Sequence, residues 1–355
     1  MEEQMNALQS NDSFPSTTRL PVLDGWRAIS ILCVLAGHML PLGPKYLSLN
    51  EMTATAGMSI FFFLSGFLIV SMLARNPNVL SFLVRRLTRI IPLAWLFLLV
   101  VWLTAGPDSP SVAANFLFYA NLPPTQLFHH AEHFWSLCVE MQFYAAIAAI
   151  IAVAGHRGLW LVPIACILVT IHRIAAGEHI SIVTWARIDE ILIGGCAALA
   201  IASARFSAFT KHLSPAAPFL VVPFFLASCH GSMGGIEYAR PYLTALLIAS
   251  TIHRNDDAFQ RVLTSRPLSY LARISYALYV IHPATYAGWL GEGDWLVKYS
   301  KRILSFTLTF GFAHVSTHYY ENHFISLGHR IADRIEPSKP GRNAIASAPT
   351  HSRFR

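Results

Sequence analysis

The chain has 355 residues, of which 54% are hydrophobic and 13% charged, and its mean hydropathy is +0.47. Because soluble proteins average about 25% charged residues, this composition excludes an ordinary soluble domain and a disordered chain. The 26 Lys and Arg against 19 Asp and Glu leave a formal net charge of +7. Such an excess suits nucleic acid, an anionic lipid or an anionic cofactor, and the positions of the charges decide among them.

The two ends of the chain are polar and rich in Ser, Thr, Pro and Asn. We expect residues 1–19 and 331–355 to be flexible cytoplasmic tails, and residues 20–330 to form one transmembrane domain. The N-terminal tail lacks a basic region followed by an apolar core, so no secretory signal peptide is predicted. The first hydrophobic segment is therefore expected to remain in the mature protein.

Between the tails, apolar segments alternate with Pro, Gly and charged residues. A membrane-spanning helix needs about 20 mainly apolar residues. Segments near this size lie at 26–43, 55–74, 90–106, 134–155, 158–176, 186–203, 216–232, 239–253, 270–290 and 301–320. We predict an all-α, polytopic integral membrane bundle of about ten transmembrane helices.

The Lys and Arg residues are distributed unevenly over the loops. When the N-terminus is placed in the cytoplasm, most of the 26 fall in cytoplasmic loops and in the C-terminal tail, in agreement with the positive-inside rule. We therefore predict that both termini lie in the cytoplasm. Membrane orientation then explains the basic excess, and nucleic-acid binding is not needed.

The first apolar segment carries ionisable residues near both of its ends. Asp24 and Arg27 lie at its start, and His38 follows Arg27 by eleven positions. In a helix this spacing puts Arg27 and His38 within about 20° of the same face and about 16 Å apart. Ionisable residues at membrane depth are functional candidates, although a snorkelling Arg and a structurally hydrogen-bonded His explain the pair equally well.

A second basic pair, Arg86 and Arg89, lies before Pro92 at the start of the third segment. Residues three apart are neighbours on a helix, and guanidinium groups bind phosphates through paired hydrogen bonds. The pair therefore predicts a cytoplasmic site for an anionic cofactor. For an isolated Arg cluster, a positive-inside anchor or a contact with anionic lipid is the more common explanation.

The fourth segment begins near Trp135 and Ser136 and contains Glu140. We place Glu140 about one and a half turns below the outer interface, at a depth that His38 can also reach. A carboxylate that faces an imidazole orients the ring and raises its basicity, so Glu140 is predicted to assist His38. The alternative is a protonated Glu140 with a structural hydrogen bond.

Three further segments carry polar groups inside apolar sequence. They contain Arg187 and Glu190, Tyr276 and His282, and Glu321. We expect His282 to reach the level of His38, and Glu321 to pair with a basic residue at the cytoplasmic face. For the sixth and ninth segments, an interhelical hydrogen bond explains the polar groups as well as a catalytic role does.

Neither the cysteines nor the histidines predict a metal site. The five cysteines lie in or beside apolar runs without CxxC spacing, which is typical of small buried hydrophobic residues. His129 and His133 would share one face of a helix, but no further ligand has a convincing spacing. We expect no metal and no disulfide framework.

Taken in chain order, these segments resemble the membrane acyltransferase family 3, whose members move acyl groups, often acetyl, onto carbohydrates and other acceptors. The resemblance extends from about Leu23 to Leu327. It rests on the ordered motifs LDGWRA with Arg27 and His38, FFFLSGFLI, RRLTRIIP with Arg86 and Arg89, WSLCVEMQFY with Glu140, RIDEILIGG, ISYALYVIH with His282, and YYENHF with Glu321. Each motif alone is weak, but their common order is specific.

The resemblance implies a ten-helix core that takes acyl-CoA from the cytoplasm and modifies an acceptor at or beyond the outer half of the membrane. It assigns the catalytic role to His38, a partner role to Arg27, and contact with the acyl donor to Arg86 and Arg89. Two departures stand out: His323 replaces a proline that relatives commonly have, and no esterase-like domain follows the tenth segment. Acceptor selection is then expected to rest with the bundle or a partner.

We therefore expect a multi-pass O-acetyltransferase of the bacterial cytoplasmic (inner) membrane that uses acetyl-CoA to modify a hydroxyl of a glycan or lipid-linked sugar. His38 would be the base or the acyl acceptor. Substrate binding or support is expected from Asp24, Trp135, Ser136, Tyr276, His282, Arg187, Glu190 and Glu321. The expected partners are acyl-CoA, the carbohydrate acceptor and membrane lipid, and a homo-oligomer is compatible with the sequence.

An alternative from another functional class is a proton-coupled transporter or flippase of a small acidic solute or lipid-linked sugar. The same buried His and Glu residues would then relay protons, so hydropathy does not separate the two functions. The basic pair weakly favours the enzyme, because a nucleotide-like donor gives it a task. A structural or receptor-like protein leaves the order of the motifs unexplained.

Overall fold

The computed structural model describes residues 20–106, 109–201, 210, 216–252 and 258–336. These residues are mostly helical, and no strand occurs among them, which confirms the all-α prediction for this part of the chain. The predicted N-terminal tail lies outside the described residues. The predicted C-terminal tail starts inside a helix, because the last helix continues to Ile335.

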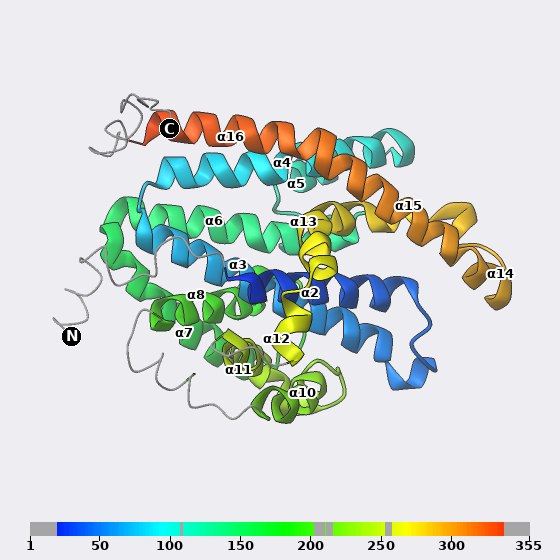
Figure 1. The fold of residues 1–355 in the computed structure, drawn as a ribbon, viewed down its shortest axis with the longest axis horizontal. Helices are drawn as coiled ribbons and strands as arrows, with labels where there is room; N and C mark the ends of the chain where they lie inside the picture. The colour runs from blue at the N-terminus through cyan, green and yellow to red at the C-terminus, as the bar shows by residue number, and fades with distance from the viewer. Residues whose placement is uncertain (1–19, 107–108, 202–209, 211–215, 253–257, 337–355) are drawn as a thin grey trace, which may run out of the picture.

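The helices follow one another closely along the chain (Figure 1). The α-helices are α2 (Pro21–Met39), α3 (Leu49–Arg75), α4 (Val79–Ala105), α5 (Ser109–Phe116), α6 (Trp135–Ala154), α7 (Leu161–Ala176), α8 (Asp189–Ile201), α10 (Ala217–Ser228), α11 (Arg240–Ile252), α12 (Ala258–Leu263), α13 (Arg266–Ile281), α14 (Trp295–Ser300), α15 (Arg302–Val315) and α16 (Asn322–Ile335). Short 3-10 turns are η1 (Lys45–Leu47), η2 (Glu132–Phe134), η3 (Gly155–Trp160), η4 (Thr184–Ala186), η5 (Gly234–Ala239), η6 (His282–Thr285) and η7 (Gly288–Leu290), while η8 (Ser316–Glu321) is a π-helical turn.

Four helical stretches are long and apolar enough to cross a membrane. They are Pro21–Met39, Lys45–Arg75, Val79–Thr104 and Glu132–Ala176. Large apolar side chains are exposed on α4 and α7, among them Leu99, Val100, Leu103, Ile164, Ile167, Leu168 and Ile171. Lipid accepts such a surface, whereas water does not, so the chain is an integral membrane protein. The number of crossings and the side of the termini stay predictions.

Helix α4 begins earlier than its apolar segment predicts. The side chain of Asn78 caps it by accepting a hydrogen bond from the backbone N–H of Ser81 (3.0 Å). The helix then continues through Pro92 to Ala105. Arg86 and Arg89 therefore lie on the same continuous helix as the apolar stretch, and their side chains are carried into the bundle.

Two glycines allow α3 and α8 to pack with their backbones in contact. A Cβ atom on Gly66 would collide with the carbonyl group of Ile191, and one on Gly194 would collide with that of Phe63. Small residues are the usual means by which helices approach closely in a membrane. This contact explains the glycines of the FLSGF and ILIGG stretches as packing residues.

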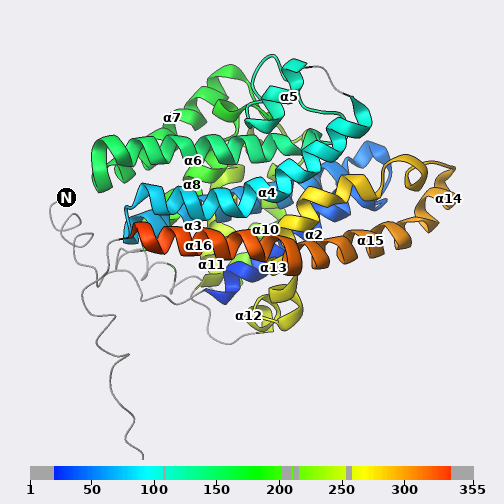
Figure 2. The ribbon, with the colours of Figure 1, turned by 90° about the horizontal axis from the view of Figure 1, so that it is seen from above.

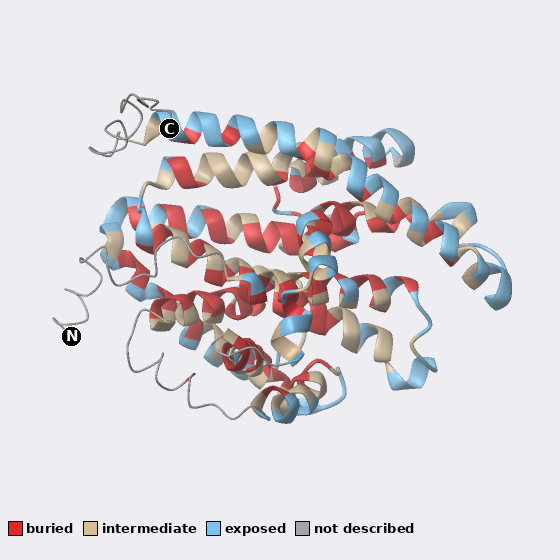
Figure 3. Cartoon of the chain, in the orientation of Figure 1, coloured by how far each residue is buried: buried red, intermediate tan, exposed pale blue. Residues whose placement is uncertain are grey.

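Buried residues concentrate where α2, α3, α6, α8 and α13 meet (Figure 3). Helix α16 lies along α4 at the outside of this group in both ribbon views (Figures 1 and 2). The central helices carry most of the motif residues. The functional candidates are consequently placed in the interior of the bundle.

Candidate active site

Two cavities lie in the centre of the bundle. The smaller has a volume of about 60 Å³, and we name it the arginine cavity because its lining includes Arg27, Arg86, Arg89 and Glu140. The larger has a volume of about 490 Å³, and we name it the histidine cavity because its lining includes His38, His133, Trp135 and Arg187. Met58 and Tyr279 line both cavities and form the wall that they share.

The cavities follow each other along the helix axes. On α2, Arg27 lines the arginine cavity and His38 the histidine cavity, and these residues are separated by about 16 Å along the axis. On α3, the residues on opposite sides of Met58 likewise line different cavities. Tyr276 of α13 lines the arginine cavity, whereas Pro283, which follows α13, lines the histidine cavity. The two cavities therefore approach the shared wall from opposite ends of the bundle.

The arginine cavity brings the predicted donor-binding residues together. Arg27 comes from α2, and Arg86 and Arg89 come from the first half of α4. Within the described chain, none of these three guanidinium groups donates a hydrogen bond or forms an ion pair. Three positive charges face one carboxylate across a small space, which is the charge pattern of an anion-binding site.

Glu140 does not occupy the position predicted for it. Its carboxylate accepts hydrogen bonds from Ser65 and from the hydroxyl group of Tyr144 (2.7 Å), and it lines the arginine cavity. Helix α6 begins at Trp135, which lines the histidine cavity, and Glu140 lies about 7.5 Å further along the helix axis. The prediction that Glu140 assists His38 is therefore replaced by a role beside the arginines.

His38 pairs with His282 instead. Nδ1 of His38 lies 2.9 Å from Nε2 of His282, and Nδ1 of His282 lies 2.7 Å from the carbonyl oxygen of Tyr279. A carbonyl group only accepts, so His282 Nδ1 carries a proton, and its Nε2 accepts the proton of His38 Nδ1 when both rings are neutral. This assignment leaves a lone pair on Nε2 of His38, the nitrogen that a base or nucleophile uses.

Burial distinguishes the two rings of this pair. His282 has no exposed surface, whereas His38 is open to the cavity that it lines. The rings stack with centroids 5.1 Å apart and an angle of 11° between their planes. His38 is thus the reactive candidate, and His282 holds it in place, at the level that the sequence predicts for His282.

A third histidine adjoins the pair. His133 donates a hydrogen bond from Nε2 to the carbonyl oxygen of Val280 (3.3 Å), and its ring lies 5.3 Å from that of His282. His129 instead pairs with Glu132 (2.9 Å) at an exposed site. His129 and His133 therefore have different partners and do not share one helix face. The sequence had raised that shared face as a metal-binding alternative.

The shared wall is fixed by hydrogen bonds and stacking. The hydroxyl group of Tyr279 donates to the carbonyl oxygen of His133, and its oxygen lies 2.5 Å from Oγ of Ser136. Phe61 stacks on the Tyr279 ring at 6.2 Å. Ser136, one of the predicted support residues, therefore acts on the position of the wall.

The remaining predicted residues lie around these two cavities. Tyr276 lines the arginine cavity and donates to the carbonyl oxygen of Ile90 (2.6 Å), while Asp24 lies in the first turn of α2. Glu321 accepts hydrogen bonds from Ser316 and Thr317 (both 3.0 Å) in the π-helical turn. Those hydroxyl groups take the place of the predicted basic partner, because the turn brings them into reach of the carboxylate.

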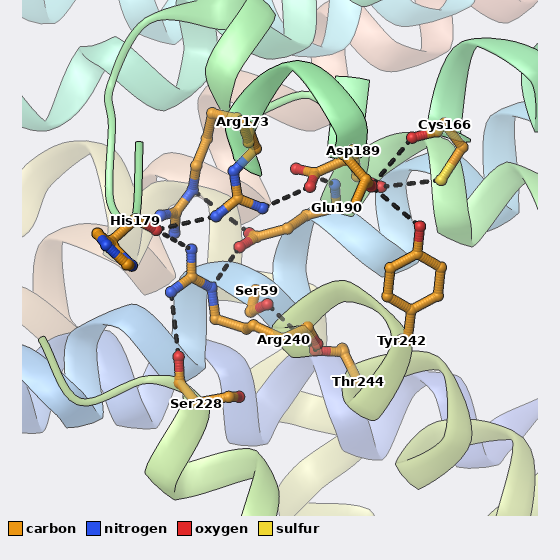
Figure 4. A network of polar contacts seen from close by, with 12 residues as sticks. Ser59, Cys166, Arg173, His179, Asp189, Glu190, Ser228, Arg240, Tyr242 and Thr244 are labelled. Atoms are coloured by element: carbon orange, nitrogen blue, oxygen red, sulfur yellow. Dashed lines mark hydrogen bonds and ion pairs between the residues drawn. The ribbon is translucent and has the colours of Figure 1, made fainter. Parts of the chain in front are cut away.

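Glu190 belongs to a buried cluster of charges (Figure 4), and Nε of Arg187 lies 3.4 Å from its carboxylate. Arg173 pairs with Asp189 (2.5 Å) and Arg240 pairs with Glu190 (2.6 Å), as the figure shows. Sequence reasoning missed Arg173 and Arg240. The available signal was an arginine inside each of two apolar segments, which is as unusual as the residues that were selected.

Comparison with known proteins identifies one family. The profile of acyltransferase family 3, described as an acyltransferase domain, matches residues 20–315. The matched range contains every residue that lines the two cavities. No solved structure gives a significant match to the chain.

Curated relatives are O-acetyltransferases by name. O-acetyltransferase OatA of Staphylococcus aureus (strain NCTC 8325 / PS 47) is 28% identical over 312 residues, covering 74% of this chain and 50% of the relative. YrhL of Bacillus subtilis (strain 168), provisionally named a peptidoglycan O-acetyltransferase, is 28% identical over 327 residues, covering 74% of this chain and 48% of the relative. The chain spans about half the length of these relatives.

Proposed function

This chain belongs to acyltransferase family 3, and we propose that it is a membrane O-acetyltransferase that transfers an acetyl group from cytoplasmic acetyl-CoA to a hydroxyl of a glycan or lipid-linked sugar. The observation that carries the proposal is the pair of cavities, one with three unpaired arginines and one with an open histidine, which share a wall. The names of the relatives support acetyl as the transferred group.

The arginine cavity is the proposed donor site. In the described chain, Arg27, Arg86 and Arg89 form no ion pair. The phosphates of CoA would supply the negative charge that these guanidinium groups bind. The small volume of the cavity suits the thin pantetheine arm, which would extend toward Met58 and Tyr279. The positive-inside distribution supports a cytoplasmic position for this cavity.

The histidine cavity is the proposed acceptor site. In direct transfer, Nε2 of His38 takes the proton of the acceptor hydroxyl while the hydroxyl oxygen attacks the thioester carbon. The carbon–sulfur bond then breaks, and the CoA thiolate receives the proton from His38. The products are an acetyl ester and CoA with a free thiol.

A covalent route uses the same atoms in two steps. Nε2 of His38 attacks the thioester carbon, CoA leaves as a thiolate, and the acetyl-imidazole passes its acetyl group to the acceptor hydroxyl. The proton released by the hydroxyl balances the thiolate. In both routes the hydrogen bond from His38 to His282 keeps Nε2 directed at the substrate.

The test uses the full chain, purified and reconstituted in lipid nanodiscs. Acetyl-CoA labelled in the acetyl group is incubated with cell-envelope glycans, and transfer of the label to glycan is measured. We expect transfer by the wild-type chain and at least a hundredfold loss in His38→Ala, within the range that a base contributes. His129→Ala, which changes an exposed histidine outside the cavity, is the matched control and is expected to keep full activity.

Two results would contradict the proposal. One is substantial acetylation by a folded His38→Ala protein, which would remove the histidine from the chemistry. The other is solute movement across proteoliposomes that needs no acetyl-CoA and occurs without label transfer, which would support the transporter.

A further inference from the structure

The buried charge cluster next to the histidine cavity contains three guanidinium groups, and their partners differ. Its members are fully or almost fully buried and comprise the guanidinium groups of Arg173, Arg187 and Arg240 and the carboxylates of Asp189 and Glu190. The carboxylate of Glu237, which is also buried, lies 3.9 Å from Nδ1 of His179. A guanidinium group in an apolar interior is costly unless its N–H groups find acceptors, so the contacts of each arginine indicate its role.

Two of the three arginines are satisfied inside the cluster. Arg173 donates to Asp189 (2.5 Å) and to the carbonyl oxygen of His179 (2.8 Å). Arg240 donates to Glu190 (2.6 Å) and to the carbonyl oxygen of Ser228 (3.2 Å). These two arginines therefore have one carboxylate each and a structural role.

Arg187 is the arginine without a hydrogen-bond acceptor. Its Nε lies 3.4 Å from Oε2 of Glu190, and both atoms are buried without a hydrogen-bond partner. Across the described residues its guanidinium group donates no hydrogen bond, and it lies 5.4 Å from the ring centre of Trp135. The side chain is 98% buried in the protein, yet it lines the histidine cavity. The two terminal amino groups of this guanidinium are thus left without an acceptor beside the cavity.

The acidic residues around the histidine cavity lie at its exposed rim. Glu51 is exposed, and the side chain of Glu132 is 59% exposed and already paired with His129. Neither carboxylate forms an ion pair with Arg187. The interior of the cavity therefore presents a cation, while its entrance carries solvated carboxylates.

We propose that Arg187 binds a carboxylate or phosphate group of the acceptor, so that the enzyme selects anionic sugars. This inference rests on the proposed function, since it treats the histidine cavity as the acceptor site. A planar guanidinium binds either group through two parallel hydrogen bonds, and such a pair orients the sugar as well as retaining it. The hydroxyl to be acetylated would then be presented to His38 on the same cavity wall.

The test measures binding without any acyl donor, so that it is independent of catalysis. Purified full-length protein in nanodiscs is titrated by calorimetry with glucuronate, glucose 1-phosphate and glucose. We expect at least one anionic sugar to bind tenfold or more tightly than glucose. A preference for glucuronate identifies a carboxylate, a preference for glucose 1-phosphate identifies a sugar phosphate, and both together support a site for either group.

Arg187→Gln is the decisive variant. It leaves Arg173 with Asp189 and Arg240 with Glu190, so the paired charges of the cluster are kept and the protein should fold normally. We expect this variant to lose the preference for anionic sugars while it keeps its affinity for glucose and its thermal stability. Arg240→Gln is the control for a structural arginine, and it is expected to lower the unfolding temperature.

The location of the bound anion can be read from Trp135, which lies against Arg187. Anionic sugar should change tryptophan emission in the wild-type chain but not in Trp135→Phe. Equal binding of all three sugars, or an anion preference that persists in Arg187→Gln, would overturn the inference. Absence of acetyl transfer with the anion preference intact would instead contradict the proposed function alone.

Discussion

At the scale of single residues, the site is marked by arginines that lack a hydrogen-bond acceptor among the described residues. Arg27, Arg86 and Arg89 face one cavity, and Arg187 faces the other, without a hydrogen bond to the described protein. By contrast, His38 is held by His282, which is itself held by a backbone carbonyl group. The arginines without acceptors are suited to bind substrates, and the histidine held in one orientation is suited to react.

The role of His282 is a prediction at this scale. His282→Ala removes the acceptor for His38 Nδ1, so the tautomer and orientation of His38 are no longer fixed. We expect kcat to fall by about 10- to 100-fold, as for other groups that orient a histidine, with little change in KM for acetyl-CoA. His282→Gln, whose amide oxygen can accept the same hydrogen bond, should recover part of kcat. An unchanged kcat in His282→Ala would refute this positioning role.

The donor site gives a second prediction. Arg86→Gln and Arg89→Gln each remove a cation from the arginine cavity, and hydrogen bonds to charged groups contribute about 1.5–3 kcal/mol. We expect KM for acetyl-CoA to rise by roughly 10- to 100-fold in steady-state assays. Arg85→Gln is the matched control, because Arg85 pairs with Asp333 (3.0 Å) and Glu336 (2.9 Å) outside this cavity. Equal KM values in all three variants would contradict the assignment.

At the scale of elements, close helix packing fixes the depth of the site residues. Gly194 of α8 meets the backbone of α3, and α3 carries Met58 of the shared wall. A larger residue at position 194 would separate the two helices and disturb the wall. The glycine motifs therefore act on the site through the distance between helices.

This packing is tested by Gly194→Ala. The new Cβ would collide with the carbonyl group of Phe63, and overpacking of this kind costs about 1–3 kcal/mol. We expect a lower unfolding temperature in nanodiscs. Gly311→Ala on α15 is the control: its Cβ would meet nothing within 4 Å, and a helical Gly→Ala change is favourable by up to about 1 kcal/mol. Similar unfolding temperatures for the two variants would contradict the close contact.

The sequence was sufficient to predict the long apolar helices and many of the residues that line the two cavities, because intramembrane charge is rare. Periodicity alone placed Arg27 and His38 on one stripe of α2, and the structure puts them in adjoining cavities on that helix. Depth was less accessible: Glu140 was matched to His38, but it lies deeper, beside the arginines. A single sequence shows which residues share one face of a helix, but not how that helix is rotated or how deep it lies relative to its neighbours.

The pairing of elements was the part that sequence reasoning could not supply. Nothing in the spacing of Arg173 and Arg240 indicates that they neutralise Asp189 and Glu190, since these contacts join α7, α8 and α11. That Arg187 is left without a hydrogen-bond acceptor becomes visible only after those pairs are known. Interhelical contacts thus distinguish structural arginines from binding arginines.

At the scale of the whole molecule, the two cavities approach each other from opposite ends of the bundle. Arg27 and His38 differ in position by about half the thickness of a bilayer core, and on α3 the linings of the two cavities lie on opposite sides of Met58. Met58 and Tyr279 line both cavities and form the protein layer between them. The arrangement allows a donor and an acceptor to react without either crossing the membrane.

The most direct measurement of this claim is sided transfer in proteoliposomes. Labelled acetyl-CoA is enclosed in the lumen, a membrane-impermeant glycan acceptor is supplied outside, and label on the external glycan is counted, with His38→Ala as the inactive control. The arrangement of the cavities predicts that wild-type protein acetylates the external glycan while acetyl-CoA stays enclosed. Transfer that occurs only when both substrates are on the same side of the membrane would contradict it.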